Sequence, residues 1–405
     1  MGIHLVLTLL HVIRHFLILV QCVALLPRFH INQCFALMMC LILTGGVALA
    51  DEESEEGKEE EKEEIQEGKF LALPIFITEP AIGEGLGVGL VYFHPQKPVE
   101  RPKILTGKGV QRVGRRSKPP PTASGVFAAY TSNDTSAIGF GHARSMMNDK
   151  YRFIGAIASL NVNATVFASD IPFDFNIEGN LIFSSIKRRF GNSNVFLGLS
   201  VSSLDADVKF KLGGNGNTPP IEFFDYDFRQ TGLALSGIYD ARDDTMMPSS
   251  GQLVDLTTWW YDDAIGSDFD YTSIRLKAHS FHQLNEKFVL GYRFYASTVS
   301  GDPPFFAVPF VSLRGIPALR FQGDTAGVFE VEGRYNFADR WAGIAFAGVG
   351  YTDTSEPIFD TENTIRAAGA GLRYQALKAQ NVWVGLDFAR GPEEDAWYIQ
   401  VGHPW

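Results

Sequence analysis

The segment Val328-Phe-Glu-Val-Glu-Gly-Arg-Tyr-Asn-Phe337 alternates between apolar and polar side chains. Phe329 and Tyr335 fall on one side of the alternation, and Glu330 and Glu332 fall on the other. A period of two places successive side chains on opposite faces of a β-strand. The segment therefore predicts a strand with one apolar face and one charged face.

The same alternation recurs to the last residue, for example over 274–279, 288–294 and 382–390, with no amphipathic helix between the segments. The segments are long enough for strands tilted across a bilayer, with lipid outside and a polar lumen inside. Backbone groups in lipid must be hydrogen-bonded, so such a sheet must close. Residues 70–405 are predicted to form one all-β transmembrane antiparallel barrel of about 16 strands.

The composition agrees with a barrel. The chain of 405 residues contains 40 glycines and 32 phenylalanines, and aromatic residues make up 13% of it, yet its mean hydropathy is near zero. Alternating strands combine many aromatic residues with average hydropathy, whereas transmembrane helices do not. The formal net charge of −11 argues against a nucleic-acid-binding protein.

The first 50 residues are predicted to be a signal peptide or other targeting segment, because an apolar run precedes Ala48 and Ala50 in a cleavage-site pattern. A retained membrane anchor is the alternative. All 3 cysteines lie in this segment, which favours an exported protein. Residues 51–69 hold 11 acidic residues and 3 lysines. They predict a disordered acidic tether, with a docking tail for a basic periplasmic partner as the other interpretation.

A basic segment lies between residues 95 and 122. It contains eight lysines and arginines and a single acid, Glu100. If Gly83–Phe93 is the first strand and both termini are periplasmic, this segment is extracellular. We then expect it to contact lipopolysaccharide phosphates, or to be a solvated proline-rich loop.

Motifs of enzymes and metal sites are scarce. The sequence has no G-x-S-x-G, H-E-x-x-H, P-loop or C-x-x-C motif. His279 and His282 are three residues apart, which places them on opposite faces of a strand. We therefore expect no enzyme activity, no metal and no cofactor.

Four segments carry a more specific pattern. A proline-rich lead and alternating glycines occupy Leu73–Gly89. A turn of the form Asp-x-Arg-Asp, then Pro, then Gly occupies Asp240–Gly251 and includes Arg242, Asp243 and Pro248. An Arg-Gly pair, Arg314 and Gly315, interrupts an apolar run. The final strand places Trp397, Ile399, Val401 and Trp405 on one face.

Together these segments resemble the BamA/TamA-like outer-membrane barrels, also called the bacterial surface antigen family. The resemblance covers most of the chain after residue 70, with the motifs in the family's order. It implies that 240–251 is a periplasmic turn and that the final strand is the signal for insertion into the outer membrane. The acids of the turn can pair with Arg242, while Pro248 and Gly251 fix its shape; docking of a partner is the alternative role.

The resemblance also implies that the segment around Arg314 is an extracellular loop folded into the lumen. A guanidinium enclosed there needs acidic partners. Glu332 and Glu330 are the expected partners, because they lie on the polar face. The family usually has another acid where this sequence has Gly348, so one partner is expected to be missing.

The implied function is insertion of outer-membrane proteins, or polypeptide translocation, through a weak lateral seam between Gly83–Phe93 and Trp397–Trp405. Unfolded outer-membrane proteins, a periplasmic partner and outer-membrane lipid are the expected partners. Only the acidic segment precedes the barrel where the family's insertases carry POTRA domains, so a barrel-only member is expected. A passive channel or structural barrel is the main alternative. A lipid enzyme is a third, without a catalytic motif to support it.

Overall fold

The structure is a computed structural model. It describes residues 69–77, 82–95, 103–106, 109–112, 122–168, 171–212, 221–244, 247–353, 364–377 and 382–405. The predicted targeting segment over 1–50 and the predicted tether lie outside these residues, except Lys69, which begins the first strand. Within the described residues, no helix has the length and apolar character that crossing a membrane would require.

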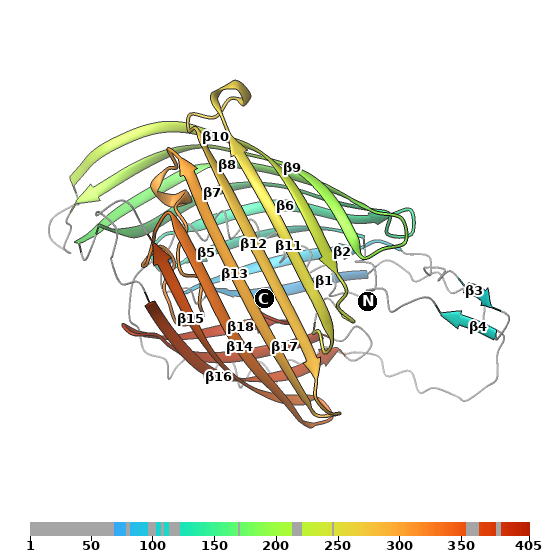
Figure 1. Cartoon of the computed structure of the whole chain (residues 1–405). Helices are drawn as coiled ribbons and strands as arrows, with labels where there is room; N and C mark the ends of the chain where they lie inside the picture. Colours follow the sequence, from blue (N-terminus) through green and yellow to red (C-terminus); the bar gives the residue numbers. More distant parts are fainter. Residues whose placement is uncertain are drawn as a thin grey trace.

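One antiparallel sheet of 16 strands forms the wall of a barrel (Figure 1). Its strands pair in chain order: β1 (Lys69–Ile77), β2 (Gly85–Phe93), β5 (Ala123–Thr131), β6 (Ser136–Met146), β7 (Tyr151–Ala168), β8 (Ile171–Arg189), β9 (Val195–Leu212), β10 (Ile221–Asp240), β11 (Gly251–Tyr261), β12 (Tyr271–Gln283), β13 (Phe288–Gly301), β14 (Thr325–Ala338), β15 (Trp341–Asp353), β16 (Thr364–Leu377), β17 (Val382–Arg390) and β18 (Asp395–Val401). A separate hairpin joins β3 (Lys103–Thr106) to β4 (Gly109–Arg112).

The predicted alternation is present. In β14, Glu330, Glu332 and Arg334 are buried inside the barrel, whereas Phe329 and Tyr335 are exposed on its outer surface. Exposed large apolar side chains also occur on other strands, for example Leu86 of β2, Ile138 of β6 and Leu199 of β9, as expected for a lipid-facing surface. The strand count and the fold class predicted from the sequence are confirmed.

The antiparallel order gives the barrel two distinct ends. The start of β1, the end of β18 and the short turns such as 284–287 and 339–340 lie at one end, here called the turn end. The connections 262–270, 302–324 and 391–394 lie at the other, here called the loop end.

The position predicted for the basic segment 95–122 is wrong. The expected first strand, Gly83–Phe93, is preceded by β1, which pairs with it from Lys69–Phe93 to Ile77–Gly85. The additional strand reverses the direction of the next one, so the connection between β2 and β5 lies at the turn end, together with both termini. If both termini are periplasmic, as expected, the segment is periplasmic too and does not meet lipopolysaccharide on the cell exterior; its basic side chains lie outside the described residues.

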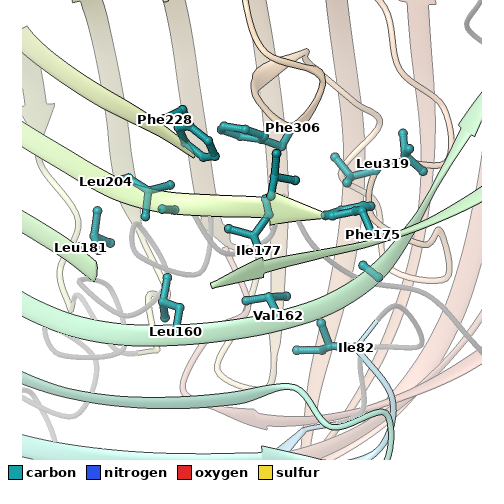
Figure 2. Close-up of a cluster of buried hydrophobic side chains, with 14 of the residues drawn as sticks. Ile82, Leu160, Val162, Phe175, Ile177, Leu181, Leu204, Phe228, Phe306 and Leu319 are labelled. Atoms are coloured by element: carbon teal, nitrogen blue, oxygen red, sulfur yellow. The ribbon is translucent and has the colours of Figure 1, made fainter. Parts of the chain in front are cut away.

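Strands β7–β10 are the longest, with 18 to 20 residues each. At the loop end their inner face contributes apolar side chains to a hydrophobic core, which includes Phe175, Ile177 and Phe228 (Figure 2). Phe306 and Leu319 of the 302–324 connection pack against this wall from inside the barrel. Burial of these side chains anchors one side of the connection in the lumen.

Candidate functional site: the lumen loop and its charge cluster

The connection between β13 and β14, here called the lumen loop (residues 302–324), folds back inside the barrel. Val311 donates its backbone N–H to Phe321 at 3.0 Å, and Gly323 donates to Pro309 at 3.0 Å. These bonds close the loop on itself. Val311, Phe321 and Leu313 are buried, so the apolar run that is too broken for a strand supplies the loop's own core.

Arg314 projects from this loop into a cluster of three carboxylates. Its guanidinium donates to Glu332 at 2.8 Å, to Asp387 at 3.0 Å and to Glu330. The guanidinium carbon also lies 3.4 Å from the ring centroid of Phe346, which adds a cation–π contact. Burial alone would lower the pKa of Arg314, but the three acids raise it above the ordinary value for arginine. The structure therefore brings together the residues that the sequence paired.

Gly315 permits the close approach of the loop to the wall. Its φ is 91°, a left-handed conformation that favours glycine. A Cβ at this position would lie 3.1 Å from the backbone of Arg390 and Gly391. Its N–H donates to the hydroxyl of Tyr398 in β18 at 2.8 Å. The Arg-Gly pair thus joins the loop to the last strand as well as to the acids.

Asp387 is the partner that sequence reasoning missed. It lies on β17, and it also accepts from Arg373 of β16 at 2.9 Å. The acid expected at Gly348 is absent because Leu313 occupies that space: a Cβ at Gly348 would lie 2.6 Å from Leu313 Cδ2. The parity of Asp387, which places it on the polar face of its strand, was the signal that could have identified it.

The chain after β18 turns into the lumen, so the predicted common face of Trp397, Ile399, Val401 and Trp405 is only partly correct. Trp397 is exposed on the outer surface, as expected. Trp405, expected on the same face, is instead buried, and its indole N–H donates to Glu330 at 2.6 Å. The reversal occurs at Gly402, whose φ is 77° and whose N–H donates to Trp383 at 2.7 Å. A strand period cannot continue through a left-handed residue.

The other members of the predicted signal are Ile399 and Val401 of β18. Ile399 is partly buried, and its odd number places it on the outward face with Trp397. Val401 ends the strand, and its side chain lies outside the described residues.

His403 binds the same cluster from the turn end. Its Nε2 lies 3.1 Å from Glu332, and its Nδ1 accepts the N–H of Trp405 at 3.4 Å. Accepting through Nδ1 while donating through Nε2 is the pattern of a neutral imidazole. Burial lowers the pKa of His403, although Glu332 acts in the opposite direction.

The predicted periplasmic turn, Asp240–Gly251, lies at the turn end and has the expected internal contacts. Arg242 donates to Asp240 at 3.0 Å. Asp243 accepts the backbone N–H of Ser249 at 3.0 Å and of Ser250 at 3.1 Å. Gly251 has a φ of 101°. These contacts fix the turn as the sequence predicted.

The turn also reaches across the barrel, which the sequence did not predict. The carbonyl of Pro248 accepts from Arg334 of β14 at 2.9 Å, and Ser249 accepts from the same guanidinium at 3.0 Å. Met247 packs with Ala342 of β15 and Trp383 of β17. The lumen is therefore crossed from the turn end by this turn and from the loop end by the lumen loop.

Metal-ligand geometry is limited in the described part of the chain to three exposed acids, Asp262, Asp263 and Asp270. Asp262 accepts the N–H of Ala264 and Asp270 accepts that of Asp263, both at 2.9 Å. These carboxylates cap backbone groups of the connection between β11 and β12. The arrangement at the lumen cluster is chemically a structural ion network, because its acids face guanidinium groups and an indole.

Comparison with known proteins agrees with this architecture. Residues 146–307 match the model of the Omp85 superfamily domain. The sequence matches no curated protein significantly. Among solved structures, the chain is similar to BamA from Haemophilus ducreyi lacking POTRA domains 1–3, with a TM-score of 0.54, 12% identity and coverage of 82% of this chain and 69% of that one.

It is also similar to two CdiB structures. For CdiB from Escherichia coli the TM-score is 0.55 at 11% identity, over 83% of this chain and 62% of that one. For CdiB from Acinetobacter baumannii the TM-score is 0.50 at 10% identity, over 82% and 59%. The chain thus spans about three fifths of the CdiB chains. Residues 146–307 thus carry the signature of the Omp85 superfamily domain, and the sixteen-stranded wall has the fold of a BamA-like barrel.

Proposed function

We propose that this barrel resides in a bacterial outer membrane and assists the insertion of outer-membrane proteins, or the translocation of polypeptides, through the seam between β1 and β18. The observation that carries the proposal is the state of these two strands. They are the edges of the sheet, and no pairing joins them within the described residues. An edge strand exposes unpaired N–H and C=O groups, which are a template for another strand.

The seam differs from the one expected from the sequence. Its first strand is β1 (Lys69–Ile77) rather than Gly83–Phe93, and its last strand ends at Val401 before the tail turns inward. β18 has seven residues, against 14 in β13. Pro74 of β1 has no N–H to contribute to a ladder, which suits an edge strand. A short edge and a proline-containing edge offer each other few ladder hydrogen bonds, so any pairing between them opens at low cost.

The occupied lumen argues against the alternative of a wide passive channel. The lumen loop is bonded to β14, β17 and β18, and the 240–251 turn is bonded to β14. Each segment is tied to the wall by charged or buried contacts, so neither vacates the lumen without losing them. The partner that fits the seam is an unpaired β-strand of an incoming protein.

The proposal is tested by reconstituting residues 51–405 in liposomes and measuring the folding rate of an unfolded client barrel added outside. We expect faster folding than in protein-free liposomes of the same lipid. Conductance is measured on the same vesicles. A large steady conductance without faster client folding would support the passive channel and reject the insertion function.

A further inference from the structure

Three side chains from neighbouring strands form a hydrogen-bonded row on the outer surface. Ser124 of β5 lies between His94, which follows β2, and His142 of β6. Ser124 Oγ is 3.0 Å from His94 Nε2 and 2.9 Å from His142 Nδ1. The ring centroids of the two histidines are 5.7 Å apart. The cross-strand register pairs Ser124 directly with His142, so the strand pairing itself holds the row together.

The row faces outward, because each member shares its strand face with exposed apolar residues. Leu90 precedes His94 on that face, Val126 follows Ser124, and Phe140 precedes His142; all three apolar residues are exposed. The row therefore lies where the apolar outer surface ends at the turn end. Tyr92 and Phe153 flank the imidazoles, with ring centroids 4.9 Å from His94 and 6.3 Å from His142. Aromatic residues beside the apolar surface mark the headgroup region of a bilayer.

The row presents hydrogen-bond donors outward. Ser124 has one hydroxyl proton, so it donates to one imidazole and accepts from the other. The imidazole that accepts from Ser124 carries its own proton on the opposite nitrogen, which faces away from the serine. Protonation of the second imidazole adds another donor. Such a row suits an anionic oxygen.

An exposed arginine lies beside the row, and a second arginine lies further along the same end of the barrel. Arg144 follows His142 on the same face and is exposed, and Arg188 pairs in register with Tyr151 on the next strands. Within the described residues no carboxylate pairs with Arg144. The nearby acid, Asp149, is turned into the lumen, where it accepts from Arg152 at 2.7 Å.

The opposite end of the outer surface carries charges of both signs, since Lys209 pairs with Asp225 and Arg229 with Asp205 there. At the loop end, β8–β10 carry a cross-strand row of acids, Glu178, Asp207 and Asp227. The loop end thus combines unpaired acids with ion pairs, whereas Arg144 at the turn end has no carboxylate partner within the described residues. At the surface of a bilayer, basic side chains attract anionic lipid headgroups, whereas acidic side chains repel them.

We propose that His94, Ser124, His142 and Arg144 bind the phosphate of an anionic phospholipid in the leaflet at the turn end. The apolar outer surface next to the row receives the acyl chains, and Arg144 supplies the charge that selects an anionic headgroup. A hydrolase using Ser124 as nucleophile fits less well, because no carboxylate orients either imidazole within the described residues. This site lies on β2, β5 and β6, which are next to the seam strand β1 but do not form the seam.

The test uses the full chain in nanodiscs of phosphatidylcholine containing a minor fraction of phosphatidylglycerol. The lipid retained on the protein is counted by native mass spectrometry. The double variant His142→Gln/Arg144→Gln is compared with Arg366→Gln, an exposed arginine on the outer surface of β16 near the loop end. Heat-dependent gel mobility verifies folding, and Ser124→Ala replaces the double variant if that variant does not fold.

We expect the unmodified chain to enrich phosphatidylglycerol, and the double variant to lose about fivefold of the enrichment, as expected for one interfacial cation. Arg366→Gln should retain it. Equal loss in Arg366→Gln would overturn the proposal, as would displacement of the lipid by inorganic phosphate at equal concentration, which would indicate a free-anion site. Release of fatty acid that Ser124→Ala abolishes would identify a hydrolase instead.

Discussion

The indole N–H of Trp405 donates to Glu330 at 2.6 Å, and Glu330 also accepts from Arg314. The two donors approach the acid from different segments, one from the tail after the last strand and one from the lumen loop. The last strand and the lumen loop are therefore coupled through one carboxylate on β14. Their stabilities should depend on each other.

Replacing Arg314 by alanine should destabilise the barrel strongly, because it leaves Glu330, Glu332 and Asp387 buried with fewer partners. Removing one partner of a buried ion pair typically costs about 3–5 kcal/mol. The measurement is the temperature at which the folded, fast-migrating form is lost in detergent gels. Arg390→Ala is the matched control, since Arg390 pairs with Asp395 at an exposed site and should change little. An Arg314→Ala variant as heat-resistant as wild type contradicts the role of this cluster.

Trp405→Phe should destabilise the folded barrel by about 1–3 kcal/mol, because it keeps the ring and removes the N–H that Glu330 accepts. Trp397→Phe removes an indole on the outer surface and should leave the free energy of unfolding of the barrel nearly unchanged. The two variants are compared by chemical denaturation in detergent, monitored by far-UV circular dichroism. Equal effects of the two substitutions would show that the lumen contact of Trp405 has no special weight.

The free energy of unfolding of the barrel should decrease as the pH falls, because His403 becomes protonated. Its pKa is lowered by burial, so its folded-state pKa lies below the unfolded value of about 6.5. A depressed pKa means that the full stability is present above about pH 6.5 and declines as the pH falls toward the folded-state pKa. The unfolding temperature measured from pH 8 to pH 5 should decrease, and His403→Gln should reduce the decrease. An identical pH profile in that variant would refute this assignment.

Restoring the family's acid by Gly348→Asp should destabilise the barrel rather than strengthen the cluster. The new Cβ would lie 2.6 Å from Leu313 Cδ2, and overpacking typically costs about 1–3 kcal/mol. The double variant Gly348→Asp/Leu313→Ala should recover part of the loss, which a double-mutant cycle measures. Additive effects would mean that Leu313 is not the reason for the glycine.

Arg334→Ala should loosen the turn at residues 240–251, because Pro248 and Ser249 lose the guanidinium that binds them. We expect more frequent opening events in planar-bilayer conductance recordings, with a folded barrel. Arg275→Ala, on the inner face of β12, is the comparison for loss of a lumen charge. Unchanged conductance in Arg334→Ala would show that the turn does not restrict the lumen.

Much of the fold could be predicted because lipid imposes a period of two on every strand. Parity alone places Glu330 and Glu332 on the polar face of their strand, and in the structure both form ion pairs with Arg314. Asp387 had the same parity, but which strands meet one loop residue depends on the loop's path through the lumen. That path is set by long-range packing and not by local pattern.

The errors have local causes. β1 contains Pro74 and lies beside the acidic segment, so its strand character is weak in the sequence, and without it the connection 95–122 is placed at the wrong end of the barrel. Trp405 has the same parity as Trp397 in the sequence, which predicts a common face. The left-handed conformation of Gly402 ends the strand alternation before Trp405. The outward row around Ser124 joins three strands, and no single segment of sequence displays it.

The central claim, activity through an opening seam, is tested most directly by cross-linking its two edges. Residues 51–405 contain no cysteine, so pairs such as Ala72→Cys with Ile399→Cys can be scanned along β1 and β18 until an oxidised pair forms. A control disulfide joins Leu256 and Leu276, which face each other across β11 and β12. We predict that closing the seam abolishes acceleration of client folding in liposomes, that reduction restores it, and that the control disulfide has no effect. Full activity with the seam closed would contradict the account.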